Sequence, residues 1–322
     1  MRAVLVDTFG GPEVLTVHDI EKPTAGPGDV IVKVAMSGVN FIDVYFRTGV
    51  YKMPPPVAIG SEAAGTVDSV GADVTGFAVG DRVAYAMARG SYAEFSKVPA
   101  AQLVKIPEGV SFEQAAAIML QGMTAHYLTH STFPLKSGDT CLVHAAAGGT
   151  GALIVQMAKA LGARVLGTVS TPEKATIAKA AGADDIIFYT EQDFAVEAKR
   201  LTSGRGVDVV YDGVGKTTFD KSLDSLRPRG MMVLFGASSG SVPPFDPLVL
   251  NPKGSLFLTR PSLAHYIATP EELAWRAGDV LGMVANGSLR VKVDAVFPLD
   301  RAADAHRVLE GRGTTGKLLI GI

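Results

Sequence analysis

Residues 144–151 read HAAAGGTG, and this stretch decides the fold of the chain around it. An apolar run, TCLV, precedes it, and an alanine-rich segment, GALIVQMAKALGA, follows. An apolar strand that passes through a glycine-rich turn into a helix is typical of dinucleotide-binding proteins. The spacing fits G-x-G-x-x-G, with Ala146, Gly148 and Gly151 in the three glycine positions. We therefore predict a nucleotide-binding turn here.

The glycines of this turn have separate predicted roles. Gly148 lets the backbone approach a pyrophosphate, and Gly151 lets the helix and the strand pack closely. The helix N-terminus offers free N–H groups and a partial positive charge to the phosphates. The alternative is a glycine-rich loop without a ligand. The predicted cofactor-binding residues of the turn are Ala147, Gly148, Gly149, Thr150 and Gly151.

Sequence patterns on both sides of the turn divide the chain into three segments with different predicted structures. Between residues 122 and 263, apolar strands such as RVLGTVS, DIIFY and GMMVLFGAS alternate with helical segments such as PEKATIAKAAGA. This alternation predicts an α/β domain with a doubly wound parallel sheet. Residues 1–121 are rich in short Val/Ile segments between Gly and Pro signals, which predicts a β-rich, barrel-like domain. Residues 264–322 are expected to return to that first domain.

The composition narrows the class of protein. The chain has 322 residues, of which 47% are hydrophobic and 19% charged, with a net charge of -2. This charge provides no strong field for nucleic acid, so nucleic-acid binding is disfavoured. The single cysteine excludes an intrachain disulfide and a thiolate metal cluster. The N-terminus has no apolar signal core and the apolar runs are interrupted, so we expect a soluble cytoplasmic protein without a membrane span.

The end of the second strand, RVLGTVS, predicts which dinucleotide binds. NAD enzymes usually place an acidic residue there for the ribose hydroxyls, whereas this strand ends at Ser170. Ser170 can donate to a 2′-phosphate and Lys174 can neutralise it, which favours NADPH. The alternative for Lys174 is a solvated helix lysine. Tyr189, after the third strand, flanks the adenosine end or caps the core.

Taken together, the motifs resemble one family over the whole chain. The segments FGGPEVL, GVNFIDVYFRTGVY, GSEAAGTVDSVGADVTGFAVGDRV, SFEQAAA, HAAAGGTG, VVYDGVG, FGASSG and LTRPS are similar to those of the zinc-independent NADPH:quinone oxidoreductases. These relatives of zeta-crystallin belong to the medium-chain dehydrogenase/reductase superfamily. The resemblance implies a GroES-like catalytic domain, a Rossmann domain that binds NADPH, a C-terminal return to the first domain, and catalysis in the cleft between them.

The resemblance also predicts that no metal takes part. Zinc-dependent members hold zinc with a Cys and a His, and Asn40 and Ser61 occupy those positions here. The cysteine-rich lobe that holds structural zinc has no counterpart after Tyr85. Amides and hydroxyls are poor zinc ligands compared with thiolate and imidazole.

The chemistry expected without a metal is reduction of an acceptor that is already electron-poor. A quinone or a related conjugated acceptor fits, because orientation against the nicotinamide supplies most of what such a reaction needs. The sequence leaves open whether a hydride or single electrons are transferred, and which group supplies the proton. Two alternatives remain: an NADPH-dependent alkene or enal reductase, and a nucleotide-binding regulatory or structural protein of the crystallin kind that contacts RNA.

The resemblance implies which residues line the catalytic site. Asn40, Tyr45 and Tyr51 are expected at the nicotinamide–substrate cleft, where Asn40 orients a carboxamide or quinone oxygen and the tyrosines stack on a flat acceptor. The alternative for the tyrosines is half-buried packing. Gln121 is expected to face the same cleft. Independently of the resemblance, a helical spacing over residues 40–47 places Asp43 and Arg47 on one face with Asn40, and the two charged side chains are expected to form an internal salt bridge rather than to act in catalysis.

Further cofactor contacts follow from the same resemblance. The expected contacts to the nicotinamide half and the phosphates are Phe235, Gly236, Ser238, Leu258 and Arg312. Each of them is equally compatible with a plain loop residue. The lone His144 is expected to be structural.

The expected partner is a second copy of the chain. Residues 231–235 and 255–259 are predicted to form one edge of the Rossmann sheet. An apolar edge strand favours pairing, so we expect a homodimer joined there.

Overall fold

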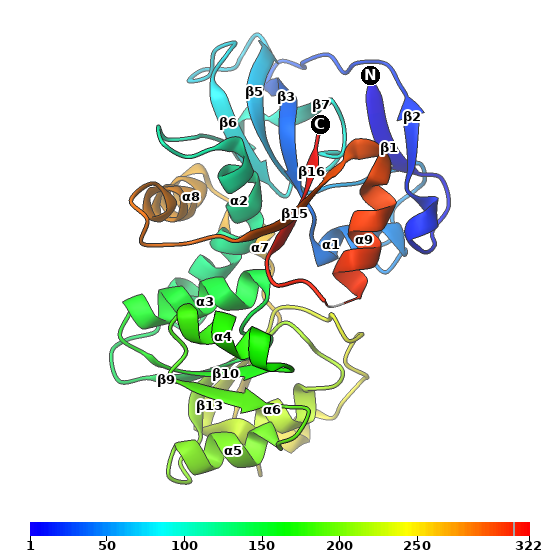
Figure 1. Ribbon diagram of the computed structural model, residues 1–322. Helices are drawn as coiled ribbons and strands as arrows, with labels where there is room; N and C mark the ends of the chain where they lie inside the picture. Colours follow the sequence, from blue (N-terminus) through cyan, green and yellow to red (C-terminus); the bar gives the residue numbers. More distant parts are fainter. Residues whose placement is uncertain (312) are drawn as a thin grey trace. The chain divides into compact units, whose positions relative to one another are not determined.

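The structure is a computed structural model that describes residues 1–311 and 313–322. It divides into two compact units (Figure 1): unit 1 comprises Met1–Met123 and Ile267–Ile322, and unit 2 comprises Thr124–Tyr266. Both termini therefore lie in unit 1.

Unit 1 is built from two β-sheets. The smaller sheet has the strand order β2-β1-β4, and the larger has the order β15-β16-β3-β5-β6-β8, with β7 also paired to β3. Its strands are β1 (Arg2–Val6), β2 (Thr16–Asp19), β3 (Asp29–Gly38), β4 (Val57–Ala58), β5 (Glu62–Val70), β6 (Arg82–Ala86), β7 (Phe95–Pro99), β8 (Leu103–Lys105), β15 (Val293–Pro298) and β16 (Lys317–Gly321). Its helices are α1 (Phe41–Arg47), α8 (Pro270–Ala285) and α9 (Ala302–Glu310), with short 3-10 turns at Pro12–Val14, Ala100–Gln102 and Leu299–Arg301. Helix α2 (Phe112–Tyr127) begins in unit 1 and ends in unit 2.

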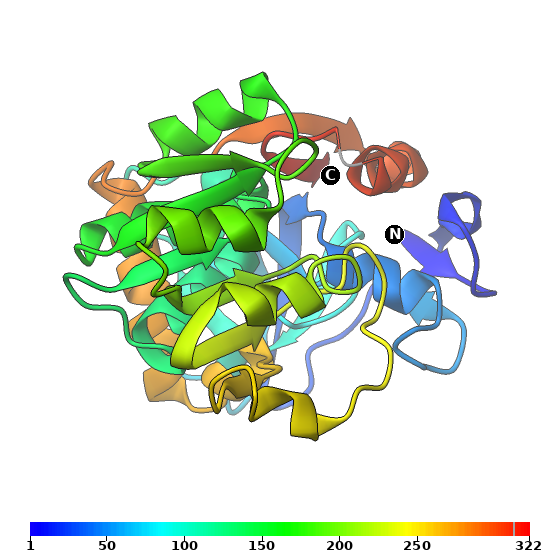
Figure 2. The ribbon, with the colours of Figure 1, turned by 90° about the horizontal axis from the view of Figure 1, so that it is seen from below.

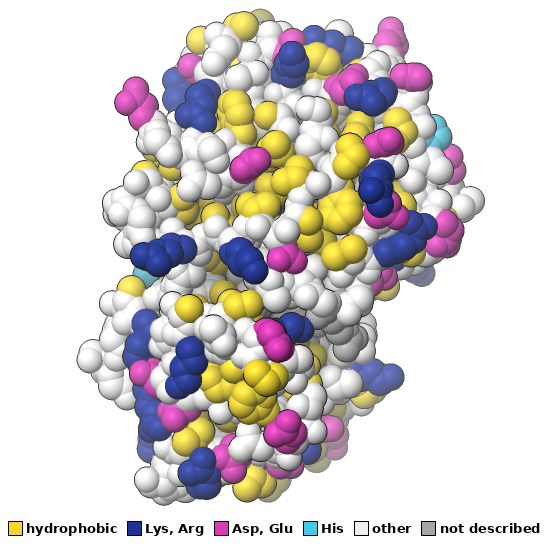
Figure 3. All heavy atoms as spheres, in the orientation of Figure 1, with side chains coloured by type: hydrophobic (Ala, Val, Ile, Leu, Met, Phe, Trp, Pro, Cys, Tyr) yellow, Lys and Arg dark blue, Asp and Glu magenta, His cyan; other side chains and the backbone are white. Residues whose placement is uncertain are grey.

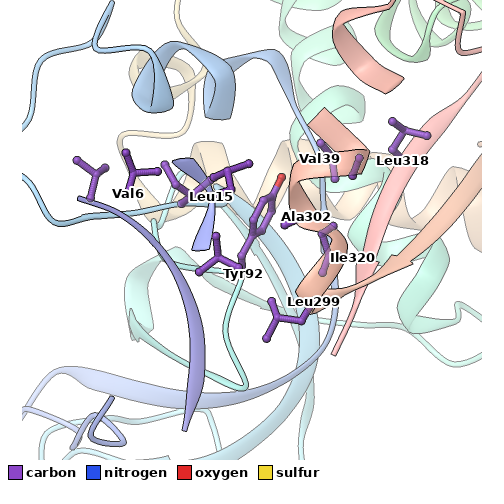
Figure 4. Packing of buried hydrophobic residues seen from close by; sticks show 12 residues of the cluster. Val6, Leu15, Val39, Tyr92, Leu299, Ala302, Leu318 and Ile320 are labelled. Carbon is purple, nitrogen blue, oxygen red and sulfur yellow. The ribbon is translucent and has the colours of Figure 1, made fainter. Parts of the chain in front are cut away.

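The C-terminal strand β16 is part of the core of unit 1. It lies beside β3 in antiparallel register, with Leu319 opposite Gly38. Leu318 and Ile320 pack with Val39, Tyr92 and apolar residues of α9 in one buried cluster (Figure 4). Figures 1 and 2 both show α9 beside this strand. The end of the chain is therefore fixed next to the segment that leads into α1.

Unit 2 is a parallel six-stranded sheet with the order β11-β10-β9-β12-β13-β14. Its strands are β9 (Thr140–Val143), β10 (Arg164–Val169), β11 (Asp185–Phe188), β12 (Val207–Asp212), β13 (Leu226–Leu234) and β14 (Phe257–Thr259). Its helices are α3 (Gly149–Ala160), α4 (Pro172–Ala180), α5 (Phe194–Leu201), α6 (Phe219–Ser225) and α7 (Leu263–Tyr266), with a π-helical turn at Leu128–Thr132 and a 3-10 turn at Pro247–Leu250.

From β9 the chain adds strands outward on one side as far as β11, and it then adds β12 to β14 on the other side of β9, as in the Rossmann fold. Helices α3 and α4 cover one face of the sheet and α5 and α6 the other (Figure 1). Every residue of β9 and β12 is buried, which explains the apolar runs CLV and VVY within them. The predicted fold class, a β-rich GroES-like domain with a doubly wound parallel-sheet domain, is confirmed.

Of the residues that the structure describes, no helix combines the length and the apolar character that a membrane span requires.

Candidate active site

The glycine-rich turn of unit 2 joins β9 to α3. Gly148 is the N-cap of α3, and the first bond into the helix runs from the Ala152 N–H to the Gly148 carbonyl at 2.8 Å. A Cβ on Gly151 would lie 2.2 Å from the carbonyl oxygen of Ala145, so only glycine fits without a backbone shift. The N–H groups of the first turn stand at the helix N-terminus, where the helix dipole favours an anion. This turn has the geometry of a phosphate cradle.

His144, the first residue after β9, connects this turn to neighbouring elements through hydrogen bonds. Its Nδ1 lies 3.0 Å from Thr168 Oγ1 and its Nε2 lies 2.9 Å from Ser222 Oγ. Ser222 donates its hydrogen to Asp212 at 3.1 Å, so it accepts from Nε2–H, and Nδ1 accepts from Thr168. Burial lowers the pKa of His144, which keeps the ring neutral. The ring ties together β9, β10 and α6, which is a structural role.

The residues predicted for the 2′-phosphate lie after β10. Ser170 and Lys174 are both half-buried, and Thr171 between them caps α4 by accepting the Lys174 N–H at 3.3 Å. Tyr189 follows β11 and is exposed. All three follow the carboxyl ends of parallel strands, the edge at which such sheets bind ligands.

The loops after β12 and β13 meet at the same edge. The N–H groups of Phe235 and Gly236 donate to the Asp212 carbonyl at 2.9 and 3.3 Å, and that of Ser238 donates to Gly213 at 3.2 Å. A Cβ on Gly236 would lie 2.4 Å from the Gly213 carbonyl oxygen, so the two loops touch through their backbones. Their expected contact with the nicotinamide stays a prediction.

The last two predicted cofactor contacts lie elsewhere. Leu258 is in β14, opposite Met232 of β13, and its side chain packs against the apolar cluster beneath α5 and α6. Part of the Leu258 surface is therefore already used in the core. Arg312 lies outside the described residues.

Asn40 lies at the centre of a buried polar cluster in unit 1. It is the N-cap of α1, the residue is 3% exposed, and the Asp43 carboxylate accepts its backbone N–H at 2.9 Å. Its Nδ2 donates to the Gly38 carbonyl at 3.3 Å and to Glu62 Oε2 at 2.9 Å. Its Oδ1 accepts from Lys317 Nζ at 2.6 Å. Both amide hydrogens thus have partners, and Oδ1 keeps one lone pair for a further donor.

Glu62 and Lys317 form an ion pair beside Asn40. Their atoms Oε2 and Nζ are 2.6 Å apart, and both side chains are 0% exposed. The other carboxylate oxygen of Glu62 accepts the backbone N–H of Leu120, in α2, at 2.6 Å. A Cβ on Gly38 would lie 2.2 Å from Glu62 Oε2, so this carboxylate fits only because residue 38 is glycine.

The same buried cluster contains a second carboxylate, that of Asp43. It accepts from Ser61 Oγ at 2.7 Å and from the Tyr92 hydroxyl at 3.4 Å. Burial raises the pKa of Asp43 from 3.8 to about 7, although the hydrogen bonds from Ser61 and from the Asn40 backbone act to lower it. Tyr92 in turn lies 3.2 Å from Nε2 of His306, and burial lowers the pKa of His306 to about 3.

Arg47 is the last member of this hydrogen-bond network, and its partners differ from the one expected from the sequence. Its guanidinium binds both carboxylate oxygens of Glu310, at 2.7 and 3.0 Å, and lies 3.1 Å from Nδ1 of His306. The expected salt bridge between Asp43 and Arg47 is therefore wrong. Arg47 leaves α1 toward α9, whereas Asp43 faces Ser61. Because the guanidinium only donates, His306 is protonated at Nε2 and donates to Tyr92.

The remaining predicted catalytic residues are two tyrosines and a glutamine. The rings of Tyr45 and Tyr51 meet edge to face, with centroids 5.4 Å apart, and Tyr51 is 40% exposed. Gln121 lies in α2, directly after Leu120, and its Oε1 is buried without a hydrogen-bond partner among the described residues. A buried acceptor without a donor is costly, so a ligand donor at this atom would be stabilising.

The sequence reasoning missed the residues that hold Asn40 and Asp43. Glu62 was visible as the last residue of the GSE segment, and Lys317 as the lysine of the final GKLLIGI. Tyr92 and His306 carry no sequence signal, because neither belongs to a motif and each meets its partners only through tertiary packing.

Among residues 1–311 and 313–322, no group of three or more His, Cys, Asp or Glu side chains is arranged to hold a metal ion. Cys141 is buried in β9.

Two family models match the chain. The alcohol dehydrogenase GroES-like domain matches residues 26–108, and the zinc-binding dehydrogenase model matches residues 149–273. The two units thus define a medium-chain dehydrogenase/reductase.

Individual relatives narrow this class. The chain is 46% identical to a quinone oxidoreductase from Pseudomonas aeruginosa, over 97% of both chains. It is 42% identical to a 2-haloacrylate reductase from a Burkholderia species, over 99% of this chain and 98% of the relative. The solved structure of Escherichia coli quinone oxidoreductase complexed with NADPH matches with a TM-score of 0.98 and 42% identity, over 100% of both chains. The chain belongs to the quinone oxidoreductase family of the medium-chain dehydrogenases/reductases, and the resemblance seen in its sequence is confirmed.

Proposed function

We propose that this chain reduces quinones with NADPH. The observation that carries the proposal is its similarity to a quinone oxidoreductase over 97% of both chains. When bound, NADPH supplies the reducing equivalents, and the residues of the chain bind and orient it and the acceptor.

Unit 2 is proposed to bind the cofactor. The phosphate cradle at residues 147–151 is proposed to hold the pyrophosphate, because Gly151 lets α3 pack closely on the turn and the free N–H groups of the helix N-terminus favour an anion. Ser170 and Lys174 are proposed to hold the 2′-phosphate, with Tyr189 beside the adenosine. Phe235, Gly236, Ser238 and Leu258 are proposed for the nicotinamide half, and Arg312 for the phosphates. The corresponding domain limits are residues 122–263 for cofactor binding and residues 1–121 with 264–322 for catalysis.

Unit 1 is proposed to supply the substrate side. Gln121 Oε1 is an acceptor ready for a ligand N–H or O–H, and Tyr45 and Tyr51 offer flat faces and hydroxyl groups to an aromatic acceptor. Because both hydrogens of the Asn40 amide are already donated, Asn40 is proposed to act only as an acceptor. The source of the proton is either one of these tyrosines or solvent.

The reaction is proposed to proceed without a metal ion. In support, Asn40 and Ser61, at the positions where zinc-dependent relatives have Cys and His, are engaged with Lys317, Glu62 and Asp43. A quinone is electron-poor without a Lewis acid.

The protein is further proposed to be a cytoplasmic homodimer. Strand β14 is at one end of the strand order in unit 2, and Phe257 within it is 57% exposed. An apolar edge strand of this kind favours pairing with a second copy.

The similarity to the 2-haloacrylate reductase makes a conjugated carbon–carbon double bond the second candidate acceptor. A nucleic-acid role has less support, because Lys and Arg are interspersed with Asp and Glu on the face drawn in Figure 3.

The test is a turnover screen of the purified protein with NADPH or NADH against small quinones, enals and 2-haloacrylates. The proposal expects oxidation of NADPH that depends on a quinone and is slower with NADH. Turnover of enals or haloacrylates alone would support the second candidate, and NADPH binding without any turnover would overturn both. Gel filtration at micromolar concentration tests the dimer, which a mass of one chain would refute. Metal analysis tests the metal-free mechanism, which zinc at one equivalent per chain would refute.

A further inference from the structure

We propose that Lys317, on the last strand of the chain, is a positioning residue for the nicotinamide carboxamide, because with Glu62 it fixes the orientation of the Asn40 amide. This inference rests on the proposed function. It makes Asn40 the acceptor of an N–H group of the cofactor.

The Asn40 amide is held between a group that only donates and a group that only accepts. The Lys317 ammonium lies 2.6 Å from Asn40 Oδ1, and the Glu62 carboxylate lies 2.9 Å from Asn40 Nδ2. An asparagine amide can rotate by half a turn and exchange its oxygen and nitrogen. Here that rotation would point the amide hydrogens at the ammonium and the amide oxygen at the carboxylate. The ion pair therefore permits one orientation only.

This orientation decides which ligand groups Asn40 can bind. Both hydrogens of Nδ2 are used, on Gly38 and Glu62, so the side chain has no donor left for a quinone carbonyl. Oδ1 keeps one lone pair, which can accept only from an N–H or O–H group. The nicotinamide carboxamide offers an N–H group, whereas an oxidised quinone offers no hydrogen. Of the two roles expected for Asn40, orienting a carboxamide or a quinone oxygen, this orientation of the amide favours the carboxamide.

The backbone fixes the position of Lys317. The N–H of Val39 donates to the carbonyl of Leu318 at 2.9 Å, so the strand that carries Lys317 is bonded to the residue before Asn40. A register slip of one residue would turn the lysine to the other face of the sheet.

A structural role alone explains the ion pair less well. Burying two charges costs desolvation energy that their attraction only partly offsets, and apolar replacements are often neutral or stabilising. What an apolar pair cannot do is set the orientation of an amide. The ion pair is thus better explained by its effect on the orientation of the Asn40 amide than by a contribution to the stability of unit 1.

The test compares binding of two ligands to Lys317→Met. NADPH contains the nicotinamide, whereas 2′,5′-ADP has the adenosine and the 2′-phosphate without it. We expect Lys317→Met and Asn40→Ala each to weaken NADPH binding about tenfold, equal to about 1.4 kcal/mol, with 2′,5′-ADP binding unchanged. The double variant should lose no more than either single variant, because both changes remove the same contact.

Two controls separate this role from a fold defect. Lys292→Met makes the same chemical change at an exposed lysine of unit 1 that contacts Thr315, and it should bind both ligands as the unchanged protein does. Glu62→Gln with Lys317→Met removes both charges of the buried pair, so it should melt closer to the unchanged protein than Lys317→Met does. It should still lose NADPH affinity selectively.

Equal losses for NADPH and 2′,5′-ADP, or unchanged NADPH binding in the double-neutral variant, would refute the positioning role. Binding is measured without a quinone, so a protein that binds NADPH but turns over no acceptor would refute the proposed function and leave this test intact. A protein that does not bind NADPH would refute both.

Discussion

The Tyr92 hydroxyl links Nε2 of His306, at 3.2 Å, to Oδ2 of Asp43, at 3.4 Å. Two titratable groups with opposite pKa shifts are thus joined through one hydroxyl. The pKa of Asp43 is raised from 3.8 to about 7, chiefly by burial. Burial, aided by the charge of Arg47, lowers the pKa of His306 from 6.5 to about 3. Lys317 and Glu62 also act on Asp43, with opposite signs.

These shifts predict opposing pH effects on stability. Asp43 contributes stability that is complete below pH 3.8 and is lost as the pH rises through about 7. His306 contributes stability that is complete above pH 6.5 and is lost as the pH falls through about 3. From about pH 4 to pH 6.5 the two slopes, each about 1.4 kcal/mol per pH unit at most, oppose each other. The two effects should therefore nearly cancel, and the free energy of unfolding should change little with pH over this range.

Single substitutions should reveal the pH dependence of stability that each of the two groups contributes. In Asp43→Asn the melting temperature should fall as the pH is lowered from 6.5 to about 4, because only the His306 effect remains. In His306→Gln it should fall as the pH is raised over the range from 4 to about 7. Melting curves recorded at intervals of pH test both. Variant profiles that run parallel to that of the unchanged protein would contradict this coupling.

The glycine-rich turn should not tolerate a side chain at Gly151. A Cβ there would lie 2.2 Å from the Ala145 carbonyl oxygen, so Gly151→Ala must move backbone. We expect a loss of stability of about 1–3 kcal/mol and weaker binding of both NADPH and 2′,5′-ADP. Gly278→Ala is the matched control, since α8 leaves that position open. It should stabilise by about 0.5–1 kcal/mol. Unchanged ligand binding in Gly151→Ala would argue against the phosphate cradle.

The choice of NADPH should depend on Lys174. Lys174→Ala is expected to raise the KM for NADPH about tenfold and to leave that for NADH unchanged, because the proposed role of the lysine is to neutralise the 2′-phosphate, which NADH lacks. Lys179→Ala, on the same helix, is the control, since Lys179 donates to the Asp184 carbonyl at the other end. Ser170→Asp should shift the preference further toward NADH by repelling the phosphate. An equal change for both cofactors would assign Lys174 to the helix surface.

Sequence patterns predicted the fold well, and the side-chain network poorly. The apolar runs at β9 and β12 and the glycines at residues 148 and 151 are local signals, so the parallel sheet and its turn could be read directly. The contact between Asn40 and Lys317 joins residues 277 positions apart, and no local pattern specifies it. The partner of Arg47 was misassigned for the same reason. A helical spacing suggested Asp43, whereas tertiary packing brought Glu310 from α9.

The last prediction asks whether Tyr51 binds the acceptor or packs against Tyr45. The two rings meet edge to face, and Tyr51 makes a similar contact with Phe46. Tyr51→Phe keeps these contacts and removes only the hydroxyl, whereas Tyr51→Leu removes the aromatic face as well. If the hydroxyl donates to a quinone, Tyr51→Phe should lower kcat/KM about tenfold with the melting temperature unchanged. If the ring only stacks, Tyr51→Phe should be active and Tyr51→Leu should raise the quinone KM. A Tyr51→Leu variant with unchanged kinetics and a lower melting temperature would show that this tyrosine only packs.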